Sequence, residues 1–337
     1  MIGVGRATGR ALASAAAAVL ITACGAGTAS STAGAARSAA ASTAPRTTST
    51  TPTTSTTPTA STTSTTNAAV RRPGGAPVDS YPVSLTARWR VLARVDGRPA
   101  LWIAQRSGVT LVRIDQRLAH LALHAGSQDP GGTGWRYGDA IAGNEIHRLI
   151  LGVNGGFKFA TGSGGFLAYG RTAVPLRSGL GSVVTYVNGV TEIGAWGSEV
   201  PQHGRPIASV RQNLALLVDR GVPNPSSTSC GAVCWGATIG GLAAVARSGL
   251  GIRADGQLLW AAGEGLTVAQ LAGAMAAADV QRAVELDINP DWVAGYLYVH
   301  HRAGPLTPVP VVPGQYGIYG HLLAPYTRDF FTVLAGA

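Results

Sequence analysis

The 337-residue sequence has a single lysine, three cysteines and no apolar run long enough to cross a bilayer. Its leading apolar run, residues 11–21, is shorter than the roughly 20 residues that a membrane-spanning helix needs. The serine-hydrolase motif G-x-S-x-G is absent, and no G-x-G-x-x-G follows the first predicted strands. No internal repeat indicates a solenoid or propeller. A serine-hydrolase elbow, a dinucleotide site and a repeat architecture are therefore excluded.

The first 24 residues have the pattern of an export signal. Arg6 and Arg10 precede the short apolar run, which ends in Ile-Thr-Ala before Cys24. This ending resembles a bacterial lipobox, in which the cysteine is acylated; an ordinary signal peptide with a chance cysteine is the alternative. We predict a secreted, extracytoplasmic lipoprotein, held to the membrane through its lipid anchor alone. Arginine outnumbers lysine 25 to one, which indicates a GC-rich genome and hence a Gram-positive bacterium of that type.

Residues 25–77 consist almost entirely of Ser, Thr, Ala and Pro. Such a composition buries too little apolar area to offset the conformational entropy of the chain, so we predict a disordered stalk. Residues 1–77 carry six arginines and no acidic residue, whereas residues 78–337 carry 20 basic and 16 acidic side chains. The predicted folded part is only mildly basic. Its charge argues against a nucleic-acid partner and favours a small anionic substrate.

With Cys24 lipidated, Cys230 and Cys234 remain as a pair. An even remainder in an exported protein predicts a disulfide, which here closes a short loop. A zinc half-site with the spacing C-x3-C is the alternative. No second cysteine pair or close histidine pair completes four ligands, so we predict no zinc site.

Residues 78–337 are predicted to form one α+β domain with a mostly antiparallel or mixed β-sheet core and a few covering helices. Three hairpins are expected, because Asp-Gly and Asn-Gly tolerate the positive φ of two-residue turns. Their turns are Asp96-Gly97, Asn188-Gly189 and Asp255-Gly256. The clearest helix spans 268–278, with Thr267 and Gln270 as a capping box. A weaker helix is predicted over 141–149.

Paired carboxylates lie in the strand predicted over residues 280–288. Val284, Leu286 and Ile288 alternate with Glu285 and Asp287, so the two acids share one face with Cα atoms roughly 7 Å apart. Pro290 and Asp291 follow Asn289 directly, and proline stops a strand from continuing. Two neighbouring acids at a strand end repel each other unless a cation, a proton or a substrate lies between them. A solvated edge face is the alternative.

A glycine-rich segment follows another predicted strand, residues 149–153. It reads Asn154-Gly155-Gly156 and leads to Lys158, the lysine of the chain. Glycines let backbone N–H groups approach a bound anion, and the lysine adds positive charge, although an ordinary Asn-Gly turn is an alternative. Four tryptophans beside glycines or turns are candidates for the core or for stacking on a sugar ring. They are Trp135, Trp196, Trp235 and Trp292.

The order of motifs over residues 119–333 resembles the phosphodiester glycosidase family, the uncovering-enzyme-like domain. The motifs are N-G-G-F at 154–157, R-Q-N at 211–213, R-S-G-L-G at 247–251, G-L-T at 265–267 and L-D at 286–287, with R-D-F-F at 328–331. The family typically has D-G-G-G-S where this chain has D-I-N-P-D. Asp287 therefore matches, while the pocket beside it is expected to differ in shape and polarity.

The resemblance implies a hydrolase that cleaves a glycosyl phosphodiester, a sugar-1-phosphate ester, plausible in cell-envelope glycans. It implies Asp287 as base or nucleophile, with Glu285 as the second carboxylate. Substrate binding is predicted for Asn154, Gly155, Gly156, Lys158, Arg211, Asn213, Arg247 and Asn289. The leaving phosphate ester is a stable anion and needs charge stabilisation more than a strong acid. No organic cofactor is implied; a carboxylate-bound divalent cation stays an alternative.

A second function fits the same sequence. The chain could be a catalytically inactive glycan- or phosphoglycan-binding envelope lipoprotein that kept the fold without the D-G-G-G-S segment. Both functions predict a cleft that faces a glycan. They differ in whether Asp287 acts on the substrate.

Overall fold

The computed structural model describes residues 77–316 and 322–336, which all belong to the unit Ser64–Ala337. The signal segment, the lipidation site at Cys24 and the stalk up to residue 76 lie outside the described residues, so they stay predictions. No helix of the described part has both the length and the apolar character needed to cross a membrane.

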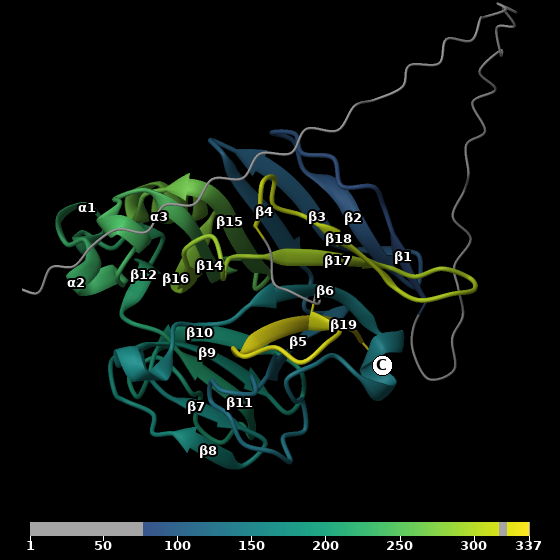
Figure 1. The fold of residues 1–337 in the computed structure, drawn as a ribbon, viewed down its shortest axis with the longest axis horizontal. Coiled ribbons are helices and arrows are strands. Elements are labelled where there is room, and N and C mark those ends of the chain that lie inside the picture. Colours follow the sequence, from purple (N-terminus) through teal and green to yellow (C-terminus); the bar gives the residue numbers. More distant parts are fainter. Residues whose placement is uncertain (1–76, 317–321, 337) are drawn as a thin grey trace, which may run out of the picture. The chain divides into compact units, whose positions relative to one another are not determined.

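Antiparallel strands dominate the described residues and form three sheets (Figure 1). The largest has nine strands in the order β1-β2-β3-β4-β15-β14-β16-β12-β13. They are β1 (Val78–Ser80), β2 (Arg90–Val95), β3 (Arg98–Arg106), β4 (Val109–Ile114), β12 (Leu216–Asp219), β13 (Val222–Pro223), β14 (Val245–Arg253), β15 (Leu258–Leu266) and β16 (Val280–Ile288). The predicted antiparallel core with few helices is confirmed, whereas the single domain stays a prediction.

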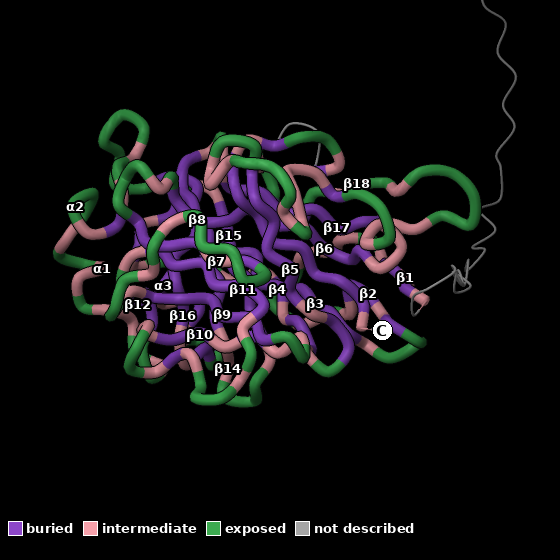
Figure 2. Tube along the Cα trace, turned by 90° about the horizontal axis from the view of Figure 1, so that it is seen from below, coloured by how far each residue is buried: buried purple, intermediate pink, exposed green. Residues whose placement is uncertain are grey.

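Two five-stranded sheets complete the core. One has the order β10-β9-β11-β7-β8 and the other β18-β17-β6-β19-β5. Their strands are β5 (Ala119–His124), β6 (Leu149–Asn154), β7 (Phe166–Ala168), β8 (Arg171–Val174), β9 (Gly181–Tyr186), β10 (Thr191–Ala195), β11 (Ile207–Gln212), β17 (Gly295–Val299), β18 (Thr307–Pro310) and β19 (Phe330–Ala335). Val153, Phe166 and Leu286, one from each sheet, belong to the same buried apolar cluster. Figure 2 shows this buried centre with exposed loops around it.

All three predicted hairpins are confirmed. β2 pairs with β3, β9 with β10 and β14 with β15. The second turn residues Gly97, Gly189 and Gly256 have φ values of 69°, 84° and 77°. Glycine has no Cβ to clash in this region of φ, so these dipeptides close their hairpins without side-chain strain.

The predicted long helix is also confirmed, as α3 (Val268–Ala276). Thr267 Oγ1 accepts the backbone N–H of Gln270, and the Gln270 side chain accepts the backbone N–H of Thr267. Leu271 and Met275 are buried on the face that packs against the nine-stranded sheet. The helix ends two residues before the predicted end, and the chain then enters β16.

The helix predicted over 141–149 is wrong. A short 3-10 helix, η1 (Gly143–His147), takes its place. Gly143 has a φ of 63°, which interrupts an α-helix, and Leu149 already pairs with β19 as the first residue of β6. The other short helices are α1 (Ser226–Ser229), α2 (Ala232–Trp235), η2 (Phe159–Thr161) and η3 (Ile239–Gly241).

Candidate functional site

The carboxylate strand is confirmed as β16, and its end meets the glycine-rich loop that follows β6. The backbone N–H of Asp287 donates to the carbonyl of Gly155 at 2.8 Å. Asn289 then adopts a φ of 75°, and its N–H donates to Ala246 of β14 at 2.8 Å. This turn ends the strand just before Pro290. The ends of strands from two different sheets are thereby joined at Asp287.

A cavity of about 280 Å³ opens at this junction. Asp287 and Asn289 line it from the end of β16, Lys158 from the glycine-rich loop, and Trp292 and Arg328 from later loops. Apolar parts of the wall come from Phe157, Thr161, Leu214, Ala232, Val233, Gly236, Ala237 and Ile288. The cavity lies near the lower end of the volume range of small-molecule sites, and its few charged groups converge in an apolar wall.

Asp287 is the acidic side chain of this cavity. Its residue is 6% exposed, one carboxylate oxygen lies 2.6 Å from Arg328 Nη2, and the other accepts the N–H of Ile288 at 3.0 Å. Burial raises the pKa of Asp287 to about 7, against the opposing effect of the Arg328 charge. A carboxyl group that titrates near neutrality, in a cavity that reaches solvent, is suited to proton transfer or to nucleophilic attack.

Arg328 connects the two walls of the cavity. Nη2 also donates to the carbonyl of Gly156 at 3.2 Å, and Nε lies 3.2 Å from Asp129 Oδ2. The guanidinium carbon lies 4.9 Å from the Trp292 ring centroid, and Lys158 Nζ lies 5.6 Å from the same ring. One indole therefore carries two cations at the cavity wall, which favours an anionic group nearby.

Glu285 lies outside the cavity lining, although it shares a strand face with Asp287. It is fully buried, and its carboxylate binds Arg247 Nη1 at 2.7 Å. Burial raises the pKa of Glu285 to about 8, and the Arg247 charge opposes this rise. Arg247 is 3% exposed, its Nε donates to the carbonyl of Leu266, and it lines a neighbouring cavity of about 600 Å³. The two predicted carboxylates are brought close, but only Asp287 faces the smaller cavity.

Asn154 lies directly behind Asp287. Its side-chain amide donates to Ser248 Oγ at 2.9 Å, and Ser248 Oγ donates to the carbonyl of Asp287 at 3.0 Å. Asn154 is 2% exposed and does not line the cavity. These two predicted site residues therefore lie close together, with Asn154 placed to hold the backbone of β16 and not to line the cavity.

Arg211 and Asn213 support the glycine-rich loop from β11 and its end. Arg211 Nε and Nη2 contact the two carboxylate oxygens of Asp329 at 2.8 and 3.0 Å, and neither side chain is exposed. Asn213 Oδ1 accepts the N–H of Phe157 at 3.3 Å, while its amide donates to the carbonyl of Glu285. Both predicted binding residues lie outside the cavity lining and hold its walls in place.

The glycines of this loop do approach an anion, and the anion is Asp329. The N–H of Gly156 donates to Asp329 Oδ2 at 3.1 Å, and the N–H of Gly155 donates to the Asp329 carbonyl. A Cβ on Gly155 would lie 2.2 Å from Asp329 Oδ2, and one on Gly156 would lie 2.6 Å from the Arg211 guanidinium. Close packing of the loop against this buried ion pair explains why glycine stands at both positions.

The predicted disulfide joins Cys230 and Cys234, with Cα atoms 5.6 Å apart. Between the two cysteines, Ala232 and Val233 contribute to the cavity wall. Nearby, Asn289 Oδ1 accepts the N–H of Ile239 at 2.9 Å, so the segment after the disulfide is tied to the end of β16. Within residues 77–316 and 322–336, no group of three or more His, Cys, Asp or Glu side chains could hold a metal ion.

Sequence reasoning missed the roles of Arg328 and Asp329. Both belong to the R-D-F-F segment before β19, which contributed to the family resemblance but was not assigned to the site. An adjacent Arg-Asp pair beside a strand is a weak local signal. Its partners, Asp287 and Arg211, lie far away in the sequence.

Comparisons with known proteins gave similarities to solved structures alone. No family model matches the chain, and no curated protein matches it either. The chain is similar to the catalytic domain of zebrafish N-acetylglucosamine-1-phosphodiester alpha-N-acetylglucosaminidase, with 15% identity and a TM-score of 0.45 over 80% of this chain and 87% of that one. It is also similar to a hypothetical protein from Synechocystis, with 12% identity and a TM-score of 0.36 over 72% and 63%.

Proposed function

We propose that the chain is an extracytoplasmic hydrolase that cleaves glycosyl phosphodiesters at the cavity around Asp287. One observation carries the proposal: a single cavity combines a carboxylate of near-neutral pKa with two cations and the half-buried Trp292 ring. A sugar ring can stack on Trp292, while Lys158 and Arg328 face its phosphate. The motif order of the sequence supports the same class of substrate.

The proposed chemistry begins at the anomeric carbon. Its bond to the phosphate oxygen breaks, and the electron pair leaves with the phosphate monoester. Lys158 and Arg328 stabilise that anion, so the leaving group needs no protonation by a strong acid. Water supplies the hydroxyl of the product sugar, and the remaining proton goes to Asp287 or to solvent.

Asp287 stabilises the oxocarbenium-like transition state in either of two roles. As nucleophile it would form a glycosyl ester that water then hydrolyses, and the sugar would retain its configuration. As base it would activate water directly, and the configuration would invert. The sequence suggested Glu285 as a second catalytic carboxylate. Because it is buried against Arg247, we propose instead that it serves as the counter-ion of Arg247 and does not contact the substrate.

The test measures turnover of methyl and aryl sugar-1-phosphate diesters by wild type and Asp287→Asn. We expect the variant to lose at least about 1,000-fold in kcat while its Kd for the substrate changes little, since the carboxylate is required in the transition state. Asp291→Asn is the matched control, because Asp291 is exposed and does not line the cavity. NMR of the released sugar then separates retention from inversion.

A non-catalytic glycan-binding protein is the second candidate. The ion pair between Asp287 and Arg328 favours it, because a carboxylate held at 2.6 Å from a cation is a weaker base and nucleophile. Wild-type protein that binds envelope glycans but turns over no member of a broad diester panel would establish this function instead. For both candidates we propose that the lipid at Cys24 and the stalk of residues 25–77 tether the domain outside the membrane.

A further inference from the structure

A second pair of cavities lies at the opposite end of β6 from the candidate site. Their volumes are about 530 and 390 Å³, and both are lined by Arg136, Tyr137, Arg148 and Leu334. Arg148 immediately precedes β6, whereas Asn154 ends it beside Asp287. Six strand residues at about 3.3 Å each place these cavities roughly 20 Å from the candidate site. We call these two neighbouring cavities together the arginine groove.

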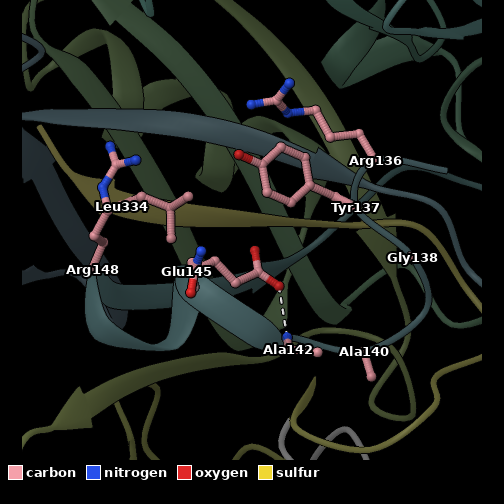
Figure 3. A pocket seen from close by; sticks show the side chains of 9 residues that line it. Arg136, Tyr137, Gly138, Ala140, Ala142, Glu145, Arg148 and Leu334 are labelled. Carbon is pink, nitrogen blue, oxygen red and sulfur yellow. Dashed lines mark hydrogen bonds between the residues drawn. The ribbon is translucent and has the colours of Figure 1, made fainter. Parts of the chain in front are cut away.

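The two arginines of this groove have no acidic partner among the described residues. Arg148 uses Nε to donate to the carbonyl of Ala335 at 2.8 Å, and its other guanidinium nitrogens form no ion pair with an acidic residue of the described part. Arg136 is exposed, and its guanidinium carbon lies 4.9 Å from the Tyr169 ring centroid and 5.9 Å from that of Tyr137. Figure 3 shows Arg148 beside Leu334 at the left of the pocket and Arg136 with Tyr137 at the upper right, with Ala140 and Ala142 below.

One acidic side chain lines the groove, and its oxygens already have neighbours. Glu145 Oε1 accepts the N–H of Ala142 at 2.7 Å, as the dashed line in Figure 3 marks. Glu145 Oε2 lies 3.2 Å from His124 Nε2. Two guanidinium groups and one carboxylate thus line the groove, and that carboxylate already accepts the N–H of Ala142, so the groove keeps an excess of positive charge.

The remaining lining fits a sugar better than a bare ion. Asn144 and Asn188 offer amide groups, and Tyr137 and Tyr169 offer aromatic faces with hydroxyl groups. Each cavity exceeds the size of an inorganic anion several times over. A ring with hydroxyl groups can use these faces and amides while its charged substituent meets the guanidinium groups.

We propose that the arginine groove binds an anionic sugar unit, with Arg136 and Arg148 contacting its phosphate or carboxylate group. The groove goes beyond the proposed hydrolase and does not depend on it. If the ligand is an envelope polymer with repeated negative charges, the arginine groove holds one sugar unit while another unit of the same polymer reaches the cavity at Asp287.

The test is isothermal titration calorimetry of the purified full-length protein at low ionic strength. The probes are glucose 6-phosphate, glucuronate, uncharged glucose and inorganic phosphate. We expect at least one of the two charged sugars to bind at least tenfold more tightly than glucose. Arg136→Gln/Arg148→Gln should weaken that binding at least tenfold, because both cations are removed. Arg88→Gln/Arg302→Gln is the matched control, since it removes the same charge from exposed positions outside the groove.

Each outcome decides the proposal. Preference for glucose 6-phosphate or for glucuronate supports it and identifies the anionic group. Inorganic phosphate that binds as tightly as glucose 6-phosphate overturns the sugar assignment, and so does equal binding of glucose. The proposal that the arginine groove is the binding site is refuted if Arg136→Gln/Arg148→Gln still binds the charged sugar. It is also refuted if Arg88→Gln/Arg302→Gln loses as much affinity.

Two further variants keep this test decisive. If loss of the Arg148 contact to Ala335 unfolds the double variant, Arg136→Gln alone must weaken binding at least threefold, since Arg136 is exposed and makes ring contacts. Asp287→Asn must retain charged-sugar binding at the groove. If Asp287→Asn still turns over the diester substrates, the proposed hydrolase is refuted, while the proposed binding of anionic sugars at the arginine groove is unaffected.

Discussion

The buried ion pair between Arg211 and Asp329 is predicted to support the cavity wall without contacting the substrate. Both side chains are 0% exposed and meet through two hydrogen bonds, and Asp329 also accepts the N–H of Gly156. Asp329→Asn keeps the size of the side chain but leaves the Arg211 charge buried without a counter-ion. Removal of one partner from such a pair costs about 3–5 kcal/mol of unfolding free energy.

Thermal unfolding followed by circular dichroism measures this loss. For a domain of this size each kcal/mol lowers Tm by about 2–4 °C, so Asp329→Asn should unfold roughly 6–20 °C below wild type. Asp255→Asn is the control. Asp255 pairs with Arg253 at 3.4 Å with its side chain 44% exposed, and exposed pairs contribute about 0–1 kcal/mol.

A double variant tests the physical cause. Arg211→Met in the Asp329→Asn background removes the unpaired buried charge, while the asparagine can still accept the N–H of Gly156. Stability should therefore recover in part. The reasoning is refuted if Asp329→Asn loses no more than Asp255→Asn, or if the double variant is no more stable than Asp329→Asn. An Arg211→Met protein that kept its Tm but lost substrate affinity would instead support the substrate contact predicted from the sequence.

Three other predictions follow. Because Asp287 is ionised above a pKa of about 7, kcat/KM should rise with pH through that value. Arg328→Gln removes the cation that lowers the pKa of Asp287, so the rise in kcat/KM should move to higher pH, and an unchanged pH profile would contradict this effect of Arg328. Gly155→Ala should lower the free energy of unfolding in urea by about 1–3 kcal/mol, because the added Cβ overlaps Asp329. Gly273→Ala, which has open space in α3, should raise it by about 0.5–1 kcal/mol, and equal effects of the two variants would refute the packing argument. Thr267→Ala should lower the free energy of unfolding by about 1 kcal/mol, because α3 loses its N-cap. Thr267→Ser is the control and should be nearly as stable as wild type.

The arrangement of the candidate site shows how one support serves several groups. Asp329 binds Arg211 and both glycines of the loop, and that loop accepts the N–H of Asp287. Arg328, the preceding residue, binds the Asp287 carboxylate itself. Two adjacent residues before β19 therefore support one wall of the cavity: Asp329 holds the glycine-rich loop from behind, and Arg328 binds Asp287 at the cavity surface. A change at either is expected to reach Asp287.

Local signals in the sequence determined the hairpins, α3 and the strand β16 that carries Glu285 and Asp287. Each depends on neighbouring residues: glycine at a positive φ, a capping box four residues long, or an alternation of period two. The disulfide between Cys230 and Cys234 was predictable from the even number of cysteines that remain once Cys24 is assigned to the lipid. The helix predicted over 141–149 failed where Gly143 and the sheet pairing of Leu149 outweighed a weak pattern.

Only the tertiary structure decided which partner each charged group meets. Glu285 and Asp287 share a strand face, yet Arg247 of the neighbouring strand takes one and Arg328, 41 residues beyond Asp287 in the chain, takes the other. Alternation along a strand determines the side on which a carboxylate lies. It does not determine what the fold places opposite, because the register of adjacent strands and the loops that cover them come from distant segments. The sequence alone thus determined the face that carries the acids, and the packing of three sheets determined that one acid reaches the cavity.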